Sequence, residues 1–202
     1  MDNIPFHKMS GSGNDFIIID NRKEIVAEDL LKKFIVRVCT RGMSVGADGL
    51  ILIESSEWAS FRWRFFNADG SAAEMCGNGA RCAARFGFLN GLAGRKLSIE
   101  TDAGILRAEV VGRRAKVQMP DPVDVIIDRE IDLAGSLLSL SSLRIGVPHV
   151  VVKSGKMDDL VLTETGRKIR YHSALAPQGA NVNFVCRKGD GTIHNRTYER
   201  GV

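Results

Sequence analysis

Apolar residues in the first third of the chain follow two spacings, one typical of strands and one typical of a helix. Short apolar runs at residues 16–20 and 50–54 follow glycine-containing loops, which is the pattern of buried strands. Between them we expect an amphipathic helix over residues 28–38, because apolar residues recur there at helical spacing: Leu30, Leu31, Phe34, Ile35 and Val38. The opening segment therefore predicts a strand, a helix and a second strand.

A third strand and a second helix are predicted further along. Aromatic residues at positions 61, 63 and 65 alternate with arginines, as in a half-buried strand. This strand runs into Asn67-Ala-Asp-Gly70, whose Asp-Gly pair supplies the backbone freedom of a tight turn. We expect the next helix over residues 79–89, ended by Asn90-Gly91, with small residues, Phe86 and Leu89 facing inward.

A domain boundary is expected after three further strands. The strands are predicted at residues 97–101, 105–110 and 115–119. Pro120-Asp-Pro122 then gives the strongest linker signal, because proline cannot join the interior of a sheet and restricts the residue before it. We therefore expect two domains, residues 1–120 and 121–202.

The second part of the chain shows a similar order of elements, more weakly. A β run at residues 150–152 is followed by a helical segment at 158–170 and by candidate strands at 181–186 and 192–199. This order suggests, without proving it, that the two parts are repeats of one unit.

The composition is that of an ordinary globular protein. The 202 residues are 44% hydrophobic and 26% charged, with a formal net charge of +4. The longest basic cluster is Arg113, Arg114 and Lys116, too small to indicate nucleic-acid binding. Residues 1–10 lack the pattern of a secretory signal, and no run of about 18 apolar residues indicates a membrane span. We therefore expect a cytoplasmic protein with no membrane or nucleic-acid partner.

The four cysteines differ in their sequence surroundings. They contain no Cys-x-x-Cys pair, so neither a zinc site nor a disulfide framework is indicated. Cys39 and Cys82 lie in or beside predicted helices near the apolar side, and Cys186 ends an apolar strand, so we expect these three in the core. Cys76 instead precedes Gly77-Asn-Gly79, at or just before a helix N-terminus.

The position of Cys76 suggests a chemical role. A helix N-terminus lowers the pKa of a thiol, because its free N–H groups and partial positive charge stabilise the thiolate. The same N–H groups bind anions, and glycines let a carboxylate approach the backbone closely. A thiolate beside a carboxylate site suits removal of a proton from the carbon α to that carboxylate. The alternative is an inert cysteine in an Asn-Gly turn, and these residues alone leave both open.

Other polar residues near turns are candidate ligand contacts. The glycine-rich loop at residues 9–16 has neither the third glycine of a dinucleotide fingerprint nor a Gly-Lys-Ser/Thr, so it is a plain hairpin loop or one in which Asn14 offers its amide to a ligand. His149 is either structural or a base or tuning partner for a thiol. Glu199-Arg200-Gly201 is either an exposed ion pair or a site for amino and carboxylate groups. Three more asparagines are turn formers or ligand contacts: Asn67, Asn78 and Asn181.

Taken together, these stretches resemble the diaminopimelate epimerases. The resemblance runs from end to end of the chain and is most specific over residues 67–82. The segments that carry it are MSGSGNDFIIID (9–20), GADGL (46–50), FFNADGSAAEMCGNGARC (65–82), ETDAGILRAEV (100–110), GVPHVVV (146–152), GANVNFV (179–185) and YERGV (198–202).

The resemblance implies an isomerase that interconverts LL- and meso-diaminopimelate without a cofactor or a metal, in lysine and peptidoglycan-precursor synthesis. It implies an α+β fold of two similar domains, each a curled, mainly antiparallel sheet around a central helix, with the active site in the cleft between them and the second domain incomplete. Two cysteines face opposite sides of the substrate α-carbon in the family; one thiolate removes a proton and one thiol returns one. The implied partners are a small-molecule substrate and, in a homodimer, a second copy of the chain.

Site residues carry over by motif. The resemblance implies that Cys76 is the first base and that Gly77 and Asn78 hold the reacting carboxylate. The residues that match further substrate contacts are Asn14, Asn67, Asn181, Glu199 and Arg200, and those that match positions tuning the thiols are His149 and Glu199. Gly49 and Val147 stand where some relatives carry Gln and Asn, so those side-chain contacts are absent.

One expected motif is not found in this sequence. Family members carry a second Cys-Gly-[Ser/Thr]-Gly motif after Glu-Arg-Gly-Val, and residues 1–202 contain none. A single thiol can exchange hydrogen at a centre without inverting it. We therefore expect the 202-residue chain to lack epimerase activity.

Three other functions stay open. The family shares its fold with proline racemases and phenazine-pathway isomerases, so a different substrate is one of them, although Arg200 favours a substrate with a second charged end. A thiol hydrolase using Cys76 with His149 is another, and it would be acylated by activated esters or amides. The third is a non-catalytic module that binds diaminopimelate.

Overall fold

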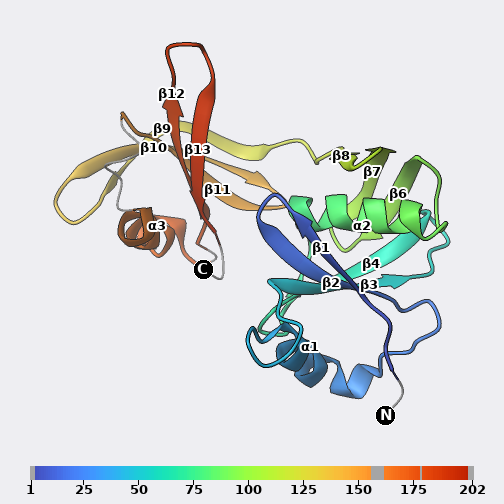
Figure 1. Cartoon of the computed structure of the whole chain (residues 1–202). Helices are drawn as coiled ribbons and strands as arrows, with labels where there is room; N and C mark the ends of the chain where they lie inside the picture. The colour runs from blue at the N-terminus through green and yellow to red at the C-terminus, as the bar shows by residue number, and fades with distance from the viewer. Residues whose placement is uncertain (1–2, 156–161, 178, 200–202) are drawn as a thin grey trace. The chain divides into compact units, whose positions relative to one another are not determined.

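The computed structural model describes residues 3–155, 162–177 and 179–199. Its contacts divide the chain into two compact units, residues 1–119 and 120–202 (Figure 1). Each unit has its own β-sheet. Residues 118–122, which include Pro120 and Pro122, have no regular secondary structure.

The first unit is built on an eight-stranded sheet with the order β1-β2-β3-β4-β6-β7-β8, to which β5 adds by pairing with β4. Its strands are β1 (His7–Gly11), β2 (Asn14–Asp20), β3 (Gly49–Glu54), β4 (Phe61–Asn67), β5 (Ala72–Ala73), β6 (Lys96–Thr101), β7 (Gly104–Val111) and β8 (Arg114–Val117). Its helices are a 3-10 turn (Glu28–Leu30), α1 (Leu31–Cys39) and α2 (Gly77–Leu89). Most neighbours are antiparallel, while β2 with β3 and β4 with β6 are parallel.

The sheet of the first unit is covered on both faces, which explains its continuous apolar runs. In β2, Phe16 and Ile18 belong to the core beside α2, whereas Ile17 and Ile19 belong to the core beside α1. The same alternation holds in β3 for residues 50–53. A strand buried on both faces needs apolar residues at every position, so it shows no alternation in sequence.

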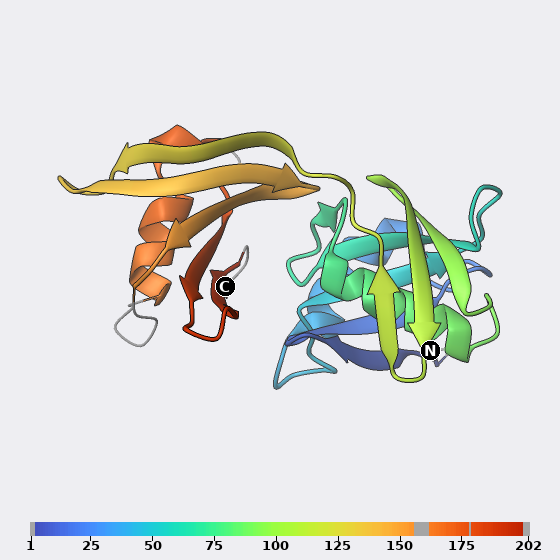
Figure 2. The same cartoon turned by 90° about the horizontal axis from the view of Figure 1, so that it is seen from above.

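The sheet curls around α2, which contacts both edge strands, β1 and β8, as well as strands between them (Figure 2). Small residues on α2 let the helix approach the sheet closely. Ala80, Ala83 and Ala84 are fully buried, and a Cβ at Gly87 would lie 2.4 Å from the Phe61 ring. Leu89, expected to face inward, is exposed, because it ends the last turn where the chain leaves the sheet.

The second unit contains a five-stranded sheet with the order β13-β12-β11-β10-β9. Its strands are β9 (Val123–Asp132), β10 (Leu137–Ile145), β11 (Val147–Lys153), β12 (Asn181–Arg187) and β13 (Ile193–Tyr198). The helix α3 (Leu162–Arg170) packs on β12 and β13, and a 3-10 turn (Ser173–Leu175) follows it. Strands β11 and β12 are parallel and their neighbours antiparallel, which repeats the arrangement of β2 and β3.

The α+β class with curled sheets is confirmed, as are the strands and helices predicted in the first unit, although β8 ends at Val117 rather than Met119. Strands β9 and β10 were not predicted. They pair with register shifts, Asp124 and Asp128 have positive φ, and β9 is largely exposed, so neither strand shows a clean alternation. The predicted helix at 158–170 lies partly outside the described residues, and the described part is α3.

The described residues contain no helix that is both long and apolar enough to cross a membrane.

Candidate functional site

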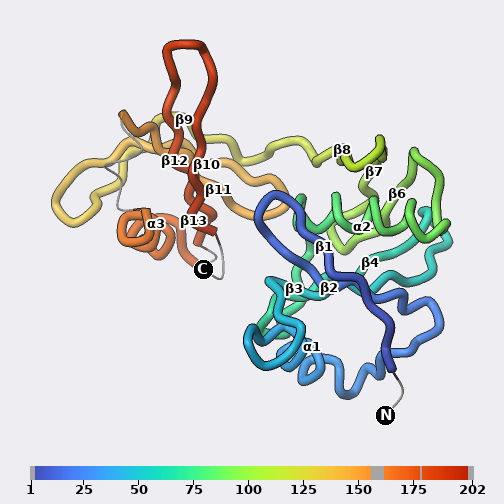
Figure 3. The backbone as a smooth tube through the Cα atoms, in the orientation of Figure 1, coloured from blue at the N-terminus to red at the C-terminus, as the bar shows by residue number. Residues whose placement is uncertain are grey.

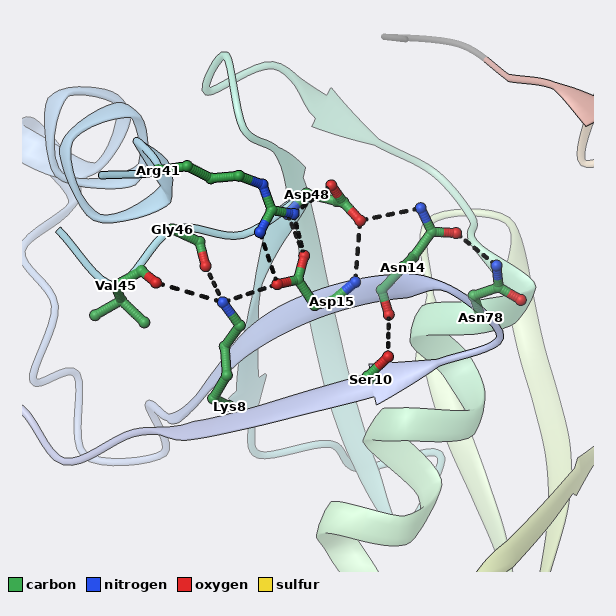
Figure 4. Close-up of polar contacts among 9 residues, drawn as sticks. All are labelled: Lys8, Ser10, Asn14, Asp15, Arg41, Val45, Gly46, Asp48 and Asn78. Atoms are coloured by element: carbon green, nitrogen blue, oxygen red, sulfur yellow. Dashed lines mark hydrogen bonds and ion pairs between the residues drawn. The ribbon is translucent and has the colours of Figure 1, made fainter. Parts of the chain in front are cut away.

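Several predicted site residues of the first unit lie at one end of its sheet. The start of β2 pairs in parallel with the start of β3, and β3 pairs antiparallel with the end of β4. This register brings Asn14, Gly49 and Asn67 to the same end of the sheet. The first turn of α2 lies there too, because the Asn78 side chain donates to Oδ1 of Asn14 at 2.6 Å (Figure 4).

Cys76 is the N-cap residue of α2. Its backbone is extended, with φ −148° and ψ 114°, and its sulfur accepts a hydrogen bond from the N–H of Gly79 at 3.4 Å. Its carbonyl accepts the first helical bond, from Ala80 at 2.8 Å. The helix interior predicted from residue 79 thus begins two residues earlier, with the thiol as the cap. A hydrogen bond to sulfur from a helix N-terminus favours the thiolate over the thiol.

The N–H groups of Gly77 and Asn78 have no hydrogen-bond partner among the residues that the structure describes. They belong to the first turn of α2, where backbone donors lack helical acceptors. The half-buried Cys76 sulfur lies at the same helix end. A thiol and a pair of anion-binding N–H groups are therefore adjacent.

Four charged side chains link the loop before β3 to β1 and β2. Asp15 pairs with Lys8 at 2.9 Å and with Arg41 at 2.5 Å, and Arg41 also reaches Asp48 at 2.8 Å (Figure 4). Lys8 also donates to the carbonyl of Gly46. The hydrogen bond from Arg41, aided by Lys8, holds the pKa of the Asp15 carboxyl well below its usual range.

Replacing Asp15 by asparagine is expected to lower stability at pH 7 by about 1–2 kcal/mol, because the charged form of Asp15 is the one that the fold stabilises. A lowered folded-state pKa contributes stability above the unfolded pKa of about 3.9, and this contribution fades as the pH falls below that value. The difference between wild type and variant in urea unfolding should therefore shrink between pH 7 and pH 3. An equal difference at both pH values would contradict the ion-pair account; the exposed Glu57→Gln serves as control.

The other cysteines differ from Cys76. Cys39 and Cys82 are buried, as predicted, and burial raises the pKa of each thiol to about 11. Cys186 was predicted in the core, but it is only partly buried and packs against the edge of the hydrophobic cluster of the second unit. The β12–β13 hairpin, to which it belongs, extends outward from its sheet (Figure 3).

Asn67 and Gly49 face each other across β3 and β4. Asn67 is exposed and donates from its amide to Ser71 at 3.0 Å. A Cβ at Gly49 would lie 2.5 Å from the carbonyl oxygen of Phe66 and 2.6 Å from the Phe65 ring. The packing of Phe65 thus leaves no room for a side chain at position 49.

The second unit holds the remaining predicted residues. His149 pairs in register with Asn181 across β11 and β12. Its Nδ1 lies 3.4 Å from the amide nitrogen of Asn183, whose oxygen accepts from Thr197 at 2.9 Å. Burial lowers the pKa of His149, which favours the neutral ring.

His149 also lines a cavity of about 410 Å³ in the second unit. Arg144, which pairs with Asp124 at 2.7 Å, lines the same cavity. Glu199 is half-buried directly after β13, and Arg200 lies outside the described residues. Val147 pairs with Ile145 at the start of β11, two residues before His149.

The predicted residues thus fall into two groups, one in each unit. Four functional candidates were not predicted: Asp48 and Arg81 around Asn14 and Asn78, and Asn183 and Thr197 beside His149. Of these four, only Asn183 could have been predicted from the sequence, because it follows Asn181 by two residues and therefore lies on the same face of the predicted strand. No group of three His, Cys, Asp or Glu side chains suited to a metal ion occurs within the described part of the chain.

Comparisons with solved structures show the fold. A hydroxyproline epimerase from Agrobacterium vitis, solved with bound trans-4-hydroxy-L-proline, superposes with a TM-score of 0.72 at 13% identity, covering 97% of this chain and 70% of that one. A phenazine biosynthesis protein from Bacillus anthracis gives a TM-score of 0.66 at 21% identity, covering 98% of this chain and 73% of that one.

Sequence comparisons show the family. The chain is 44% identical to the diaminopimelate epimerase of Aquifex aeolicus over 98% of its own length and 74% of the relative's. It is also 44% identical to the diaminopimelate epimerase of Archaeoglobus fulgidus over 98% of its length and 75% of the relative's. The family model for diaminopimelate epimerase matches residues 6–125, which include Asn14, Asn67 and Cys76–Asn78. The chain belongs to the diaminopimelate epimerase family and is an isomerase by that membership.

Proposed function

We propose that this chain removes a proton from the α-carbon of diaminopimelate and that the Cys76 thiolate is the base. The observation that carries the proposal is the position of the Cys76 sulfur, which caps α2 beside the open N–H groups of Gly77 and Asn78. The substrate is taken from the relatives, which are named diaminopimelate epimerases.

The chemistry follows from this pairing. The thiolate takes the Cα proton and becomes a thiol, while the electron pair of the broken C–H bond spreads onto the adjacent carboxylate. The N–H groups of Gly77 and Asn78 would stabilise this added negative charge in the transition state more than in the substrate. The hydrogen bond from Gly79 would support the thiolate before the transfer.

Inversion of the centre needs a second proton donor on the opposite face of the α-carbon. In the two-cysteine mechanism a second thiol supplies that proton, and residues 1–202 contain no second Cys-Gly-[Ser/Thr]-Gly motif. A polypeptide of these 202 residues would return a proton to the face from which Cys76 removed it. It would exchange the α-hydrogen with solvent but leave LL-diaminopimelate in the LL form.

We further propose roles for the remaining motif residues, in two domains of residues 1–120 and 121–202. Asn14 and Asn67 in the first would contact the substrate, as would Asn181, Glu199 and Arg200 in the second, where Arg200 suits a distal carboxylate. His149 and Glu199 would tune thiol protonation. The lowered pKa of His149 supports a neutral hydrogen-bonding role for it.

We also propose that the protein is cytoplasmic and forms a homodimer. A reducing compartment would keep Cys76 as a thiol instead of a disulfide, as proton transfer requires.

A cyclic amino acid is the second candidate substrate. The observation that favours it is the fold likeness to the hydroxyproline epimerase, at a TM-score of 0.72. At 13% identity this likeness supports the fold, so diaminopimelate is the better-supported substrate.

Protection of Cys76 from alkylation tests the substrate. LL-diaminopimelate at ten times its dissociation constant should slow the reaction of Cys76 with iodoacetamide about tenfold, because bound substrate covers the thiol. Peptide mass spectrometry measures labelling at each cysteine, and the half-exposed Cys186 is the internal control. Proline at the same concentration should give no protection.

Protection by proline but not by diaminopimelate would favour the cyclic substrate. Absence of protection by both would contradict the proposed site. Acylation of Cys76 by activated esters, with turnover, would instead support a thiol hydrolase.

A further inference from the structure

Four polar side chains form one continuous hydrogen-bonded chain between the loop before β3 and the first turn of α2. The amide nitrogen of Asn14 donates to Oδ2 of Asp48 at 3.1 Å. The amide nitrogen of Asn78 donates to Oδ1 of Asn14 at 2.6 Å (Figure 4). The guanidinium of Arg81 donates to Oδ1 of Asn78. All three hydrogen bonds run in the same direction: in each, the donor is on the Arg81 side and the acceptor is on the Asp48 side.

The two ends of the series fix that direction. An ionised carboxylate can only accept hydrogen bonds, and a guanidinium can only donate them. The NH₂ of Asn14 must therefore face Asp48, which leaves its oxygen toward Asn78. The oxygen of Asn78 must face Arg81, which leaves its NH₂ toward Asn14. Neither amide can turn over without placing an oxygen against the carboxylate or an NH₂ against the guanidinium.

Asp48 is itself held firmly. Its Oδ1 accepts from Arg41 at 2.8 Å, and its Oδ2 also accepts from the backbone N–H of Asp15 at 3.0 Å. Its own backbone N–H donates to the carbonyl of Asp15 at 3.0 Å, and its carbonyl accepts from Ala68 at 3.1 Å. At the other end, Arg81 is anchored by a 2.9 Å bond to Ser12.

We propose that Asp48 and Arg81 are positioning residues, which set the amide orientation of Asn14 and Asn78 for the substrate. Each of these two amides keeps one N–H and one oxygen lone pair without a partner among the described residues. These groups suit a carboxylate and an ammonium group, the two charged parts of an amino acid. The proposal rests on the proposed function, because Asn14 and Asn78 are taken as substrate contacts.

The Asp48→Asn variant tests the proposal because it keeps the size of the side chain but removes its negative charge, and with the charge the accept-only character that orients Asn14. We expect KM for α-hydrogen exchange to rise about tenfold, since misoriented amides bind the substrate less well. The maximal exchange rate should change less than KM, because Cys76 is untouched. Asp190→Asn, the same change in the turn of the β12–β13 hairpin, is the matched control.

A double-mutant cycle separates positioning from a general structural effect. If Asp48 acts through Asn14, Asp48→Asn should add little to the KM increase of Asn14→Ala. Additive effects would overturn the proposal, as would an unchanged KM in the Asp48→Asn variant. If Asp48→Asn fails to fold, Arg81→Gln makes the same test from the donating end of the series.

A substrate-free measurement keeps this proposal separate from the proposed function. The side-chain NH₂ signals of Asn14 and Asn78 in nitrogen-15 NMR spectra should shift in Asp48→Asn and stay unchanged in Asp190→Asn. If these signals shift but the wild type exchanges no α-hydrogen, the positioning role of Asp48 stands and the proposed function is contradicted. Unchanged Asn14 and Asn78 signals in Asp48→Asn would overturn the positioning role whatever the activity.

Discussion

Replacing Cys76 by alanine is expected to lower the rate of α-hydrogen exchange in diaminopimelate by about 10²- to 10⁴-fold, the usual contribution of a general base. The reason is its place at the start of α2, where the N–H of Gly79 bonds to the sulfur. Alanine keeps the backbone donors of Gly77 and Asn78 but removes the group that takes the proton. Deuterium incorporation from D₂O, followed by mass spectrometry, gives the rate.

The control for this variant is Cys186→Ser. Cys186 is also half-buried, and it lies in the second unit at the end of β12, where its sulfur contacts backbone carbonyls. Its loss should leave the exchange rate within about twofold of wild type, since changes away from the site have small effects. Equal losses in both variants would show that thiol removal acts through the fold, and undiminished exchange in Cys76→Ala would exclude Cys76 as the base.

The Trp63→Ala variant should lose about 3–5 kcal/mol of unfolding free energy, which is typical of removing a large aromatic side chain from a core. Trp63 is 1% exposed and packs beside Phe65 at a ring distance of 5.7 Å. It also packs on the first turn of α2, because a Cβ at Gly79 would lie 3.3 Å from its ring. Loss of this ring should therefore loosen the helix end that holds Cys76 as well as destabilise the unit.

The second tryptophan offers a matched control. Trp58 is 75% exposed in the loop before β4, so Trp58→Ala should change the unfolding free energy by no more than about 0.5 kcal/mol. Urea unfolding followed by far-UV circular dichroism measures both variants without depending on tryptophan fluorescence. Equal stability of the two variants would contradict the assignment of Trp63 to the core beside α2.

Elements with strong local patterns were predictable from the sequence, and elements specified by distant partners were not. The burial of β2, β3 and α2 could be predicted from their own residues, because β2 and β3 are continuous apolar runs and α2 is rich in small residues. Strand β9 carries no such signal, because register shifts and exposed apolar residues break the alternation. Its place in the sheet is set by pairing with β10.

The candidate site shows the same division. Cys76 was predictable because a thiol before Gly77-Asn-Gly79 has a local chemical meaning, and its N-cap geometry agrees with that prediction. Asp48 and Arg81 were not predicted, because their roles depend on contacts between segments far apart in the sequence. Asp48 meets Asn14, and Asn14 meets Asn78, only in the folded unit. A charged residue gives no sign in the sequence that it will orient an amide.

Deuterium incorporation and configuration, measured together, test most directly whether Cys76 is the base that acts on diaminopimelate. LL-diaminopimelate is incubated with the 202-residue chain in D₂O, and the recovered substrate is analysed by mass spectrometry and chiral chromatography. We expect deuterium at an α-carbon, retention of the LL form, and loss of this exchange in Cys76→Ala. Recovery of undeuterated substrate would contradict the proposal that Cys76 is the base on diaminopimelate. Conversion to the meso form at the rate of exchange would contradict the proposal that Cys76 is the only thiol that exchanges protons with the substrate in this 202-residue polypeptide.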